Sequence, residues 1–217
     1  MLSRDEPYRV IELLKSRVEY MEDGAPARYA PLPHHWQGKL RFREHDAFPD
    51  ILRTLCEWLA AAPGSMWRRY YGSQLFVLIA GDFDTPVRQV IDSLLQEPDS
   101  ARMAALAAIL HHLPQSEVWD LSFVGRCLQA ADQCGSASLD AIRGALHYAV
   151  FTGGRWGVPG QPRAQGPEHR HIAAQLADQC LSGSIEEQFY RAVAASVETW
   201  AQRLTGDWDT PPDGRQW

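Results

Sequence analysis

The chain has 217 residues, of which 45% are hydrophobic and 22% are charged, and its formal net charge is -6. This composition is that of an ordinary folded domain, and the lack of any apolar run approaching the ~20 residues of a membrane helix excludes a membrane-spanning protein. The negative net charge disfavours general binding of nucleic acid, because proteins that bind phosphates usually have a surplus of basic side chains.

The N-terminal region combines one predicted helix with a long connection. Its first residues lack the apolar core of a signal peptide, so we expect a cytoplasmic protein. From Pro7 to Met21 apolar residues recur at helical spacing, which predicts the first helix. A stretch rich in proline and glycine then leads to residue 45, and we therefore expect residues 1–45 to precede the main domain.

The first half of the main domain is predicted to form four helices. Their apolar stripes fall at residues 51–59, 67–78, 87–95 and 103–110. Thr85 is the expected cap of the third helix, and Ser100 opens the fourth. The run Leu75–Ala80 leaves a buried strand as an alternative, since periodicity does not identify a short apolar run. A sheet needs several strands, however, and the sequence offers only this one.

The second half of the main domain predicts four more helices, at residues 118–128, 139–150, 167–180 and 185–204. Ser184 and Glu187 have the spacing of a capping box before the last of these helices. Residues 205–217 contain several prolines and glycines, and we expect them to form a flexible tail.

The spacing of these helices predicts the fold class. Taken in pairs, they start near residues 46, 84, 117 and 166, and an interval of roughly 30 to 50 residues between two-helix units is typical of HEAT-like repeats. An amphipathic pair cannot bury its apolar face alone, so neighbouring pairs stack. We therefore predict an all-α domain over residues 46–204, built of HEAT-like antiparallel helix pairs stacked as a short right-handed solenoid.

An insertion at Gly153–Pro167 is the predicted binding site. Arg155, Trp156 and Arg163 stand there on a frame of glycine and proline, and they offer an aromatic surface and guanidinium groups to a phosphate, a carboxylate or a peptide. Arg143 and His147, on the preceding predicted helix, are further candidates for binding a ligand or partner. The alternative is that Trp156 simply pins the insertion to the helices.

Motifs for catalysis or metal binding are missing from the sequence. It contains no phosphate-binding loop, nucleophile elbow or HExxH motif, and its histidines lack the i, i+4 spacing of helical metal ligands. The pair His111 and His112 is explained by the carbonyl groups of a helix C-terminus. Asp82 and Asp84 are explained as the end of one helix and the start of the next. We predict no cofactor and no metal, and a small enzyme using His147, Asp82 or Asp84 is a minor hypothesis.

Part of the chain resembles a known group of proteins. Residues 118–204 contain Gly154-Arg155, the turn Pro159-Gly160-Gln161-Pro162, Ser182-Gly183-Ser184 and Gln188-Phe189-Tyr190-Arg191. This segment resembles the C-terminal helical-repeat region of bacterial conflict-system proteins, which often follows a nucleotide-binding module of the NACHT or STAND type. The resemblance implies a sensor or scaffold segment, and the ATPase module itself is missing from this sequence.

Two functions follow from these patterns. The first is a non-enzymatic binding or scaffolding module with a protein partner, acting as a sensor or adaptor in a bacterial defence system. The second is a nucleic-acid-binding HEAT-like protein of the DNA glycosylase type, with arginines and an aromatic platform on one face. The residues available for that face are Arg68, Arg69, Tyr70, Tyr71, Arg143, Arg155 and Trp156.

Overall fold

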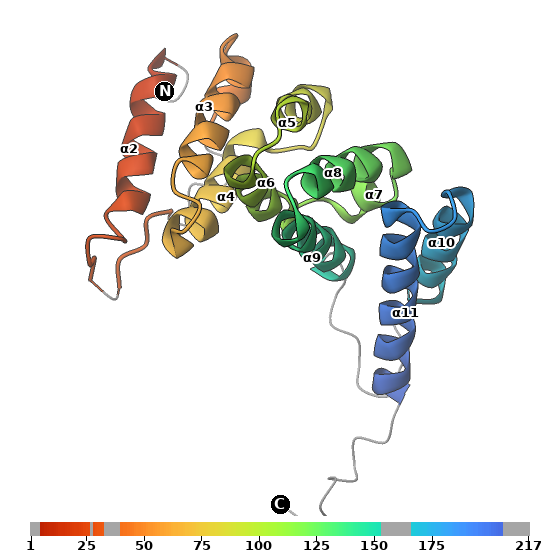
Figure 1. Cartoon of the computed structure of the whole chain (residues 1–217). Coiled ribbons are helices and arrows are strands. Elements are labelled where there is room, and N and C mark those ends of the chain that lie inside the picture. The colour runs from red at the N-terminus through yellow and green to blue at the C-terminus, as the bar shows by residue number, and fades with distance from the viewer. Residues whose placement is uncertain (1–4, 27, 33–39, 153–165, 206–217) are drawn as a thin grey trace, which may run out of the picture. The chain divides into compact units, whose positions relative to one another are not determined.

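The computed structural model describes residues 5–26, 28–32, 40–152 and 166–205 (Figure 1). Within these ranges every regular element is a helix and no strand occurs, so the predicted all-α class is confirmed. The run Leu75–Ala80, for which a strand was the alternative, is helical. None of the helices in the described ranges is long and apolar enough to cross a membrane.

The helices occur close to their predicted positions. In chain order they are α2 (Pro7–Glu19), the short 3-10 helix η2 (Phe42–Glu44), α3 (Phe48–Ala60), α4 (Met66–Ala80), α5 (Thr85–Gln96), α6 (Ser100–Leu110), α7 (Gln115–Val118), α8 (Leu121–Gln133), α9 (Ser136–Thr152), α10 (Gly166–Gln179) and α11 (Ile185–Thr205).

One predicted helix is divided in the structure. The single helix expected over residues 118–128 is wrong, because α7 ends at Val118 and α8 begins at Leu121. The carboxylate of Asp120 accepts a hydrogen bond from the backbone N–H of Phe123 at 3.1 Å. Asp120 thus caps the N-terminus of α8 and starts a new helix after the break.

One helix start differs by one residue from the prediction: Thr85, the expected cap, is the first residue of α5, and Asp84 occupies the N-cap position. Ser100 opens α6 as predicted, and Asp99 is its N-cap. Asp99 accepts hydrogen bonds from the N–H groups of two residues that follow it, at 2.8 Å each. At the start of α11, Ser184 accepts from the N–H of Glu187 at 3.1 Å, as the capping box predicted.

The chain forms two compact units, and the division passes through α8 and α9. The first unit comprises residues 1–114 and 126–149, and the second comprises residues 115–125 and 150–217. The first unit contains α2 to α6 and most of α8 and α9, and it contains the candidate site.

The core of the first unit is built around α3. This helix carries a continuous buried stripe, which includes Ile51, Leu52, Leu55, Cys56 and Leu59. It packs against α4, α5 and α6, and α4 packs against α2 and α6 as well. Because α4 lies between several neighbours, its apolar residues occupy more than one face.

The contact between α3 and α4 depends on a glycine. A Cβ atom added at Gly72 would lie 2.5 Å from Leu59 Cδ2 and 2.8 Å from a ring carbon of Trp58. Both distances are shorter than any normal contact between carbon atoms. Gly72 is therefore required for the two helices to approach each other this closely.

The end of α4 is held by Arg43, which follows the start of η2. Its guanidinium donates hydrogen bonds to the carbonyl of Ala80 and, at 3.1 Å, to that of Asp82, and it forms an ion pair with Asp84. The same group lies over the ring of Phe48, 5.2 Å from its centroid. The two aspartates thus belong to the junction between α4 and α5, as the sequence predicted.

The second unit has a small core between α10 and α11, which pack against each other. Tyr190 of α11 is fully buried, and its hydroxyl donates a hydrogen bond to the carbonyl of Val118 at 2.9 Å. Gln115 donates to the carbonyl of Val150 at 2.6 Å. Burial raises the pKa of Tyr190, so this hydroxyl stays protonated and keeps its donor role.

Candidate binding groove on helices α4, α6 and α9

The predicted site on the insertion falls largely outside the described residues. Residues 153–165 are not among them, so Arg155, Trp156 and Arg163 carry no structural description. Arg143 and His147 lie one turn apart on α9, and both are half-buried. Burial lowers the pKa of His147. Neither residue lines the groove described next.

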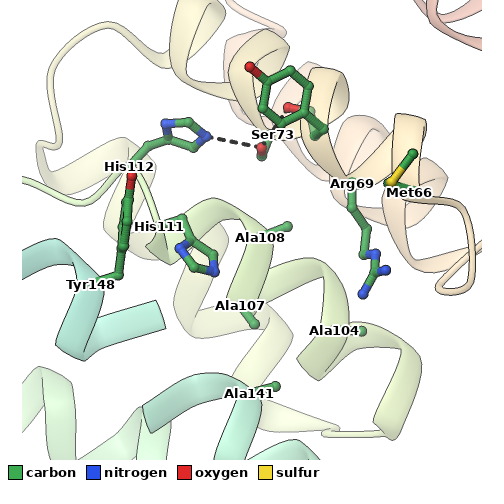
Figure 2. A pocket seen from close by; sticks show the side chains of 11 residues that line it. Met66, Arg69, Ser73, Ala104, Ala107, Ala108, His111, His112, Ala141 and Tyr148 are labelled. Carbon is green, nitrogen blue, oxygen red and sulfur yellow. Dashed lines mark hydrogen bonds between the residues drawn. The ribbon is translucent and has the colours of Figure 1, made fainter. Parts of the chain in front are cut away.

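A groove of about 530 Å³ opens in the first unit. It is intermediate between an enclosed cavity and a flat surface, and it lies among α4, α6 and α9 (Figure 2). Figure 2 shows Met66 and Arg69 on one side, His111, His112 and Tyr148 on the other, and alanines between them. The lining residues are Met66, Arg69, Tyr70, Ser73, Ala104, Ala107, Ala108, His111, His112, Ala141 and Tyr148.

The helical repeat explains why these residues share one groove. On α4, residues at positions 66, 69, 70 and 73 fall on one face, because their spacing is three to four. The same spacing joins positions 104, 107 and 108 on α6 and His111 at its C-cap, and positions 141 and 148 on α9 share a face because they are two turns apart. Ser65 fixes the start of the α4 face by accepting a hydrogen bond from the N–H of Arg68 at 3.0 Å.

Exposed apolar side chains gather at the groove. Among the described residues, seven large hydrophobic side chains are exposed, and three of them line it: Met66 at 60%, Tyr70 at 56% and Tyr148 at 51%. Between them the surface is made of alanines, which project little from their helices. The groove is therefore a largely apolar, shallow surface with bulky edges, a composition that marks binding sites more often than ordinary surface.

The electrostatics of the groove are dominated by Arg69. It is the one lining side chain with a permanent charge, no acidic side chain lines the groove, and no described residue forms an ion pair with Arg69. Partial burial lowers the pKa values of both His111 and His112. The neighbouring His111 lowers the pKa of His112 further, by a smaller amount. Both imidazoles are thus neutral at pH 7, and the groove carries one positive charge.

Two contacts fix the histidine end of the groove. His112 Nε2 lies 3.1 Å from the hydroxyl oxygen of Ser73, which is buried and donates its own proton to the carbonyl of Tyr70 at 3.0 Å (Figure 2). His111 meets the ring of Tyr148 edge to face, with centroids 5.0 Å apart. These contacts tie α6 to α4 and to α9.

The contact between Ser73 and His112 is explained by structural hydrogen bonding. When the hydroxyl donates its proton to the carbonyl of Tyr70, the contact with His112 is made by an Nε2–H of the ring. A ring that donates to Ser73 cannot act as its base, and no carboxylate lines the groove to orient the ring. The contact therefore serves to position the groove wall.

The remaining reactive groups do not form a second site. Within the described ranges no three histidine, cysteine or acidic side chains are grouped so that they could hold a metal ion. Cys56 and Cys127 are buried, and desolvation raises the pKa of each to about 12, so both are inert thiols at neutral pH. A second hollow of about 490 Å³ lies beside the ion pair of Asp92 and Arg126, whose charges neutralise each other.

Comparisons with protein families, with curated proteins and with solved structures give no match for this chain.

The sequence indicated only part of this site. Arg69 and Tyr70 were among the residues assigned to the nucleic-acid alternative, whereas His111 and His112 were assigned to a helix end. The usable signal lies in α4, where apolar and aromatic residues occupy more positions than one core-facing stripe requires. That excess indicates a second apolar face, but it does not say whether the face is covered.

Proposed function

We propose that this chain is a non-enzymatic helical-repeat binding module and that the groove on α4, α6 and α9 binds its protein partner. The observation that carries the proposal is the exposure of Met66, Tyr70 and Tyr148 around an alanine floor. Tyrosine and methionine are enriched at protein interfaces, where they bury a large area around a well-packed centre. A folded domain gains nothing in stability from leaving such side chains in water.

A HEAT-like arrangement would account for the position of the groove. The helices α3 and α4, α5 and α6, and α8 and α9 are the first three predicted pairs, and the groove is lined by the second helix of each. In a stacked array of pairs, the equivalent helices form one continuous surface, which such proteins use for binding. The solenoid and its right-handed sense remain part of this proposal, as does a role as sensor or adaptor in bacterial defence, which depends on the sequence resemblance.

The nucleic-acid alternative has weaker support. Arg69 and Tyr70 line the groove, but Arg68 is engaged in ion pairs with Glu19 and Glu22, and Tyr71 stacks on Trp67 with centroids 5.9 Å apart. Arg69 is the one cation that lines the groove, and the chain as a whole has a net charge of -6. A single cation releases few counterions when it binds a phosphate backbone. The observations therefore favour a protein partner.

Site-specific photo-crosslinking tests the proposal. A photoreactive amino acid placed at Tyr148 in the groove, and at the exposed Glu57 of α3 as a control position, would be activated in cells of the native host. We expect one discrete protein adduct from position 148, identified by mass spectrometry, and none of that size from position 57. The adduct should disappear when Ala141→Trp fills the groove.

The matched control is Ala192→Trp, at an exposed alanine of α11 outside the groove. Because Ala141 and Ala192 are both exposed, neither substitution crowds the core. An adduct that persists in Ala141→Trp, or the absence of any adduct specific to position 148, would contradict a partner-binding role for the groove.

A further inference from the structure

From the chemistry of the groove we infer that its partner is an amphipathic α-helix that places a carboxylate against Arg69. This inference depends on the proposed function, and it specifies the partner's conformation and charge. It follows from three properties of the groove: its open shape, the origin of its lining in helices, and its single unpaired charge.

The shape favours a polypeptide over a small molecule. Pockets for small ligands typically enclose about 70–90% of the ligand surface. This groove is open to solvent along its length, and its floor consists of short side chains, namely Ala104, Ala107, Ala108 and Ala141. Short side chains let the backbone of a second element come close, and a volume of about 530 Å³ holds several large apolar side chains from one face of that element.

The origin of the lining favours a helix over an extended strand. All of the lining residues lie on a helix or at its end. Inside a helix the backbone N–H and C=O groups are hydrogen-bonded to each other, so the groove offers few of them to a partner. An extended peptide on this floor would lose water from its own backbone groups and find few backbone partners in return. A helix arrives with those groups already paired, so it needs only an apolar stripe at spacings of three and four to bury the floor.

The charge of the groove determines the sign of the charge that the partner should carry beside it. Arg69 has no ion-pair partner among the described residues, whereas the adjacent Arg68 bonds to Glu19 at 3.2 Å and lies over Trp58. At pH 7 the two histidines at the other end are neutral. A glutamate or aspartate beside the apolar stripe would pair with Arg69, and a lysine there would be repelled.

Peptide selection against the full chain tests the inference. A displayed library of random peptides of about 20 residues, long enough for several helical turns, would be selected on the wild-type protein and counter-selected on Ala141→Trp. This procedure retains only peptides that need an open groove. We expect the retained sequences to share apolar residues at spacings of three and four and one acidic residue at a fixed offset from them. Their circular dichroism should become helical on binding.

A charge exchange then tests the contact with Arg69. For a selected peptide, Arg69→Glu should weaken binding by about ten-fold or more, and changing the peptide's acid to lysine should restore it. Arg69 is exposed, so the variant should fold, and its thermal unfolding curve checks this. Arg53→Glu, at an exposed arginine of α3 outside the groove, is the control for the change in net charge.

The outcomes separate this inference from the proposed function. Peptides that need the open groove but are extended, proline-rich or basic would overturn the acidic helix and leave a partner-binding groove in place. Acidic helical peptides that bind Arg69→Glu as tightly as the wild type would overturn the pairing with Arg69. Peptides that bind Ala141→Trp and the wild type equally well, with none that distinguish the two, would overturn the groove as a binding surface.

Discussion

The two sides of α4 carry adjacent arginines in opposite surroundings. On the side facing α2 and α3, the side chain of Arg68 is 14% exposed, pairs with Glu19 and Glu22, and lies with its guanidinium 4.8 Å from the centroid of Trp58. Trp58 itself donates to Glu19 at 2.7 Å. On the side facing α6 and α9, Arg69 is exposed and has no such partner among the described residues.

The difference shows how a helix divides its residues between stability and binding. The Arg68 side is closed: Arg68 bonds to Glu19 and to the carbonyl of Trp58, and Gly72 brings the backbones of α3 and α4 together. The Arg69 side is open, and its large side chains are left in water. A charge that is already paired contributes to folding, whereas an unpaired charge beside exposed apolar surface is available to a partner.

The largest effect should come from the arginine on the closed side. Arg68→Ala removes two ion pairs, a cation-π contact and a hydrogen bond to the carbonyl of Trp58, and it leaves Glu19 without its cation. We expect the free energy of unfolding to fall by about 2–3 kcal/mol. Arg69→Ala should change it by less than about 0.5 kcal/mol, since it is a surface substitution. Urea denaturation followed by circular dichroism measures both.

The comparison of the two arginines has a clear failing result. If Arg69→Ala cost as much stability as Arg68→Ala, Arg69 would be part of the folded core and would not be available to a partner. Equal and small effects for both would mean that the cluster around Trp58 contributes little, and that the two sides of α4 differ less than their contacts suggest.

The all-α class and the approximate helix positions could be predicted because their signals are local. Helices such as α3 and α6 carry apolar residues at spacings that only a helix aligns, and proline and glycine separate them. The errors were also local: Asp84 and Asp120 hold N-cap positions that the prediction did not assign, and threonine follows Asp84 directly. A one-residue choice between two good caps depends on backbone geometry that the sequence does not contain.

The groove could not be predicted because it depends on residues distant in the sequence. Arg68 and Arg69 are adjacent and chemically identical, and what distinguishes them is the packing of α2 and α3 on one side only. Tyr148 comes to the groove from α9, some 80 residues after Met66. The sequence instead indicated an insertion rich in glycine and proline, where Arg155 and Trp156 remain untested candidates.

A second, smaller effect on stability should distinguish alanine substitutions at two glycines. Gly72→Ala places a methyl group against Leu59 and Trp58, and the cost of that overlap, about 1–3 kcal/mol, exceeds the gain of up to ~1 kcal/mol in helix propensity. We expect a net loss of about 1–2 kcal/mol. A Cβ at Gly144 of α9 meets nothing within 4 Å, so Gly144→Ala should stabilise by about 0.5–1 kcal/mol. Denaturant midpoints measure both, and a loss of stability in each variant would contradict the close approach of α3 and α4.

The smallest effect is a pH dependence of stability to which the two histidines of the open side contribute. The folded protein holds the pKa values of His111 and His112 below their ordinary value of 6.5, so near pH 6 the unfolded chain binds more protons than the folded one. The free energy of unfolding should therefore reach its full value above about pH 7. It should fall as the pH drops below 6.5, and this fall should end once the pH is below the pKa values of the folded protein. Burial also lowers the pKa of the half-buried His147 on α9, which therefore adds to the same pH dependence.

The variant His112→Gln isolates this contribution. An amide can donate to Ser73 as the ring does, but it does not titrate. Between pH 7.5 and 5.5, its free energy of unfolding should fall less than that of the wild type, while the two proteins have similar stability at pH 7.5. Identical slopes would mean that the protonation of His112 costs the fold nothing.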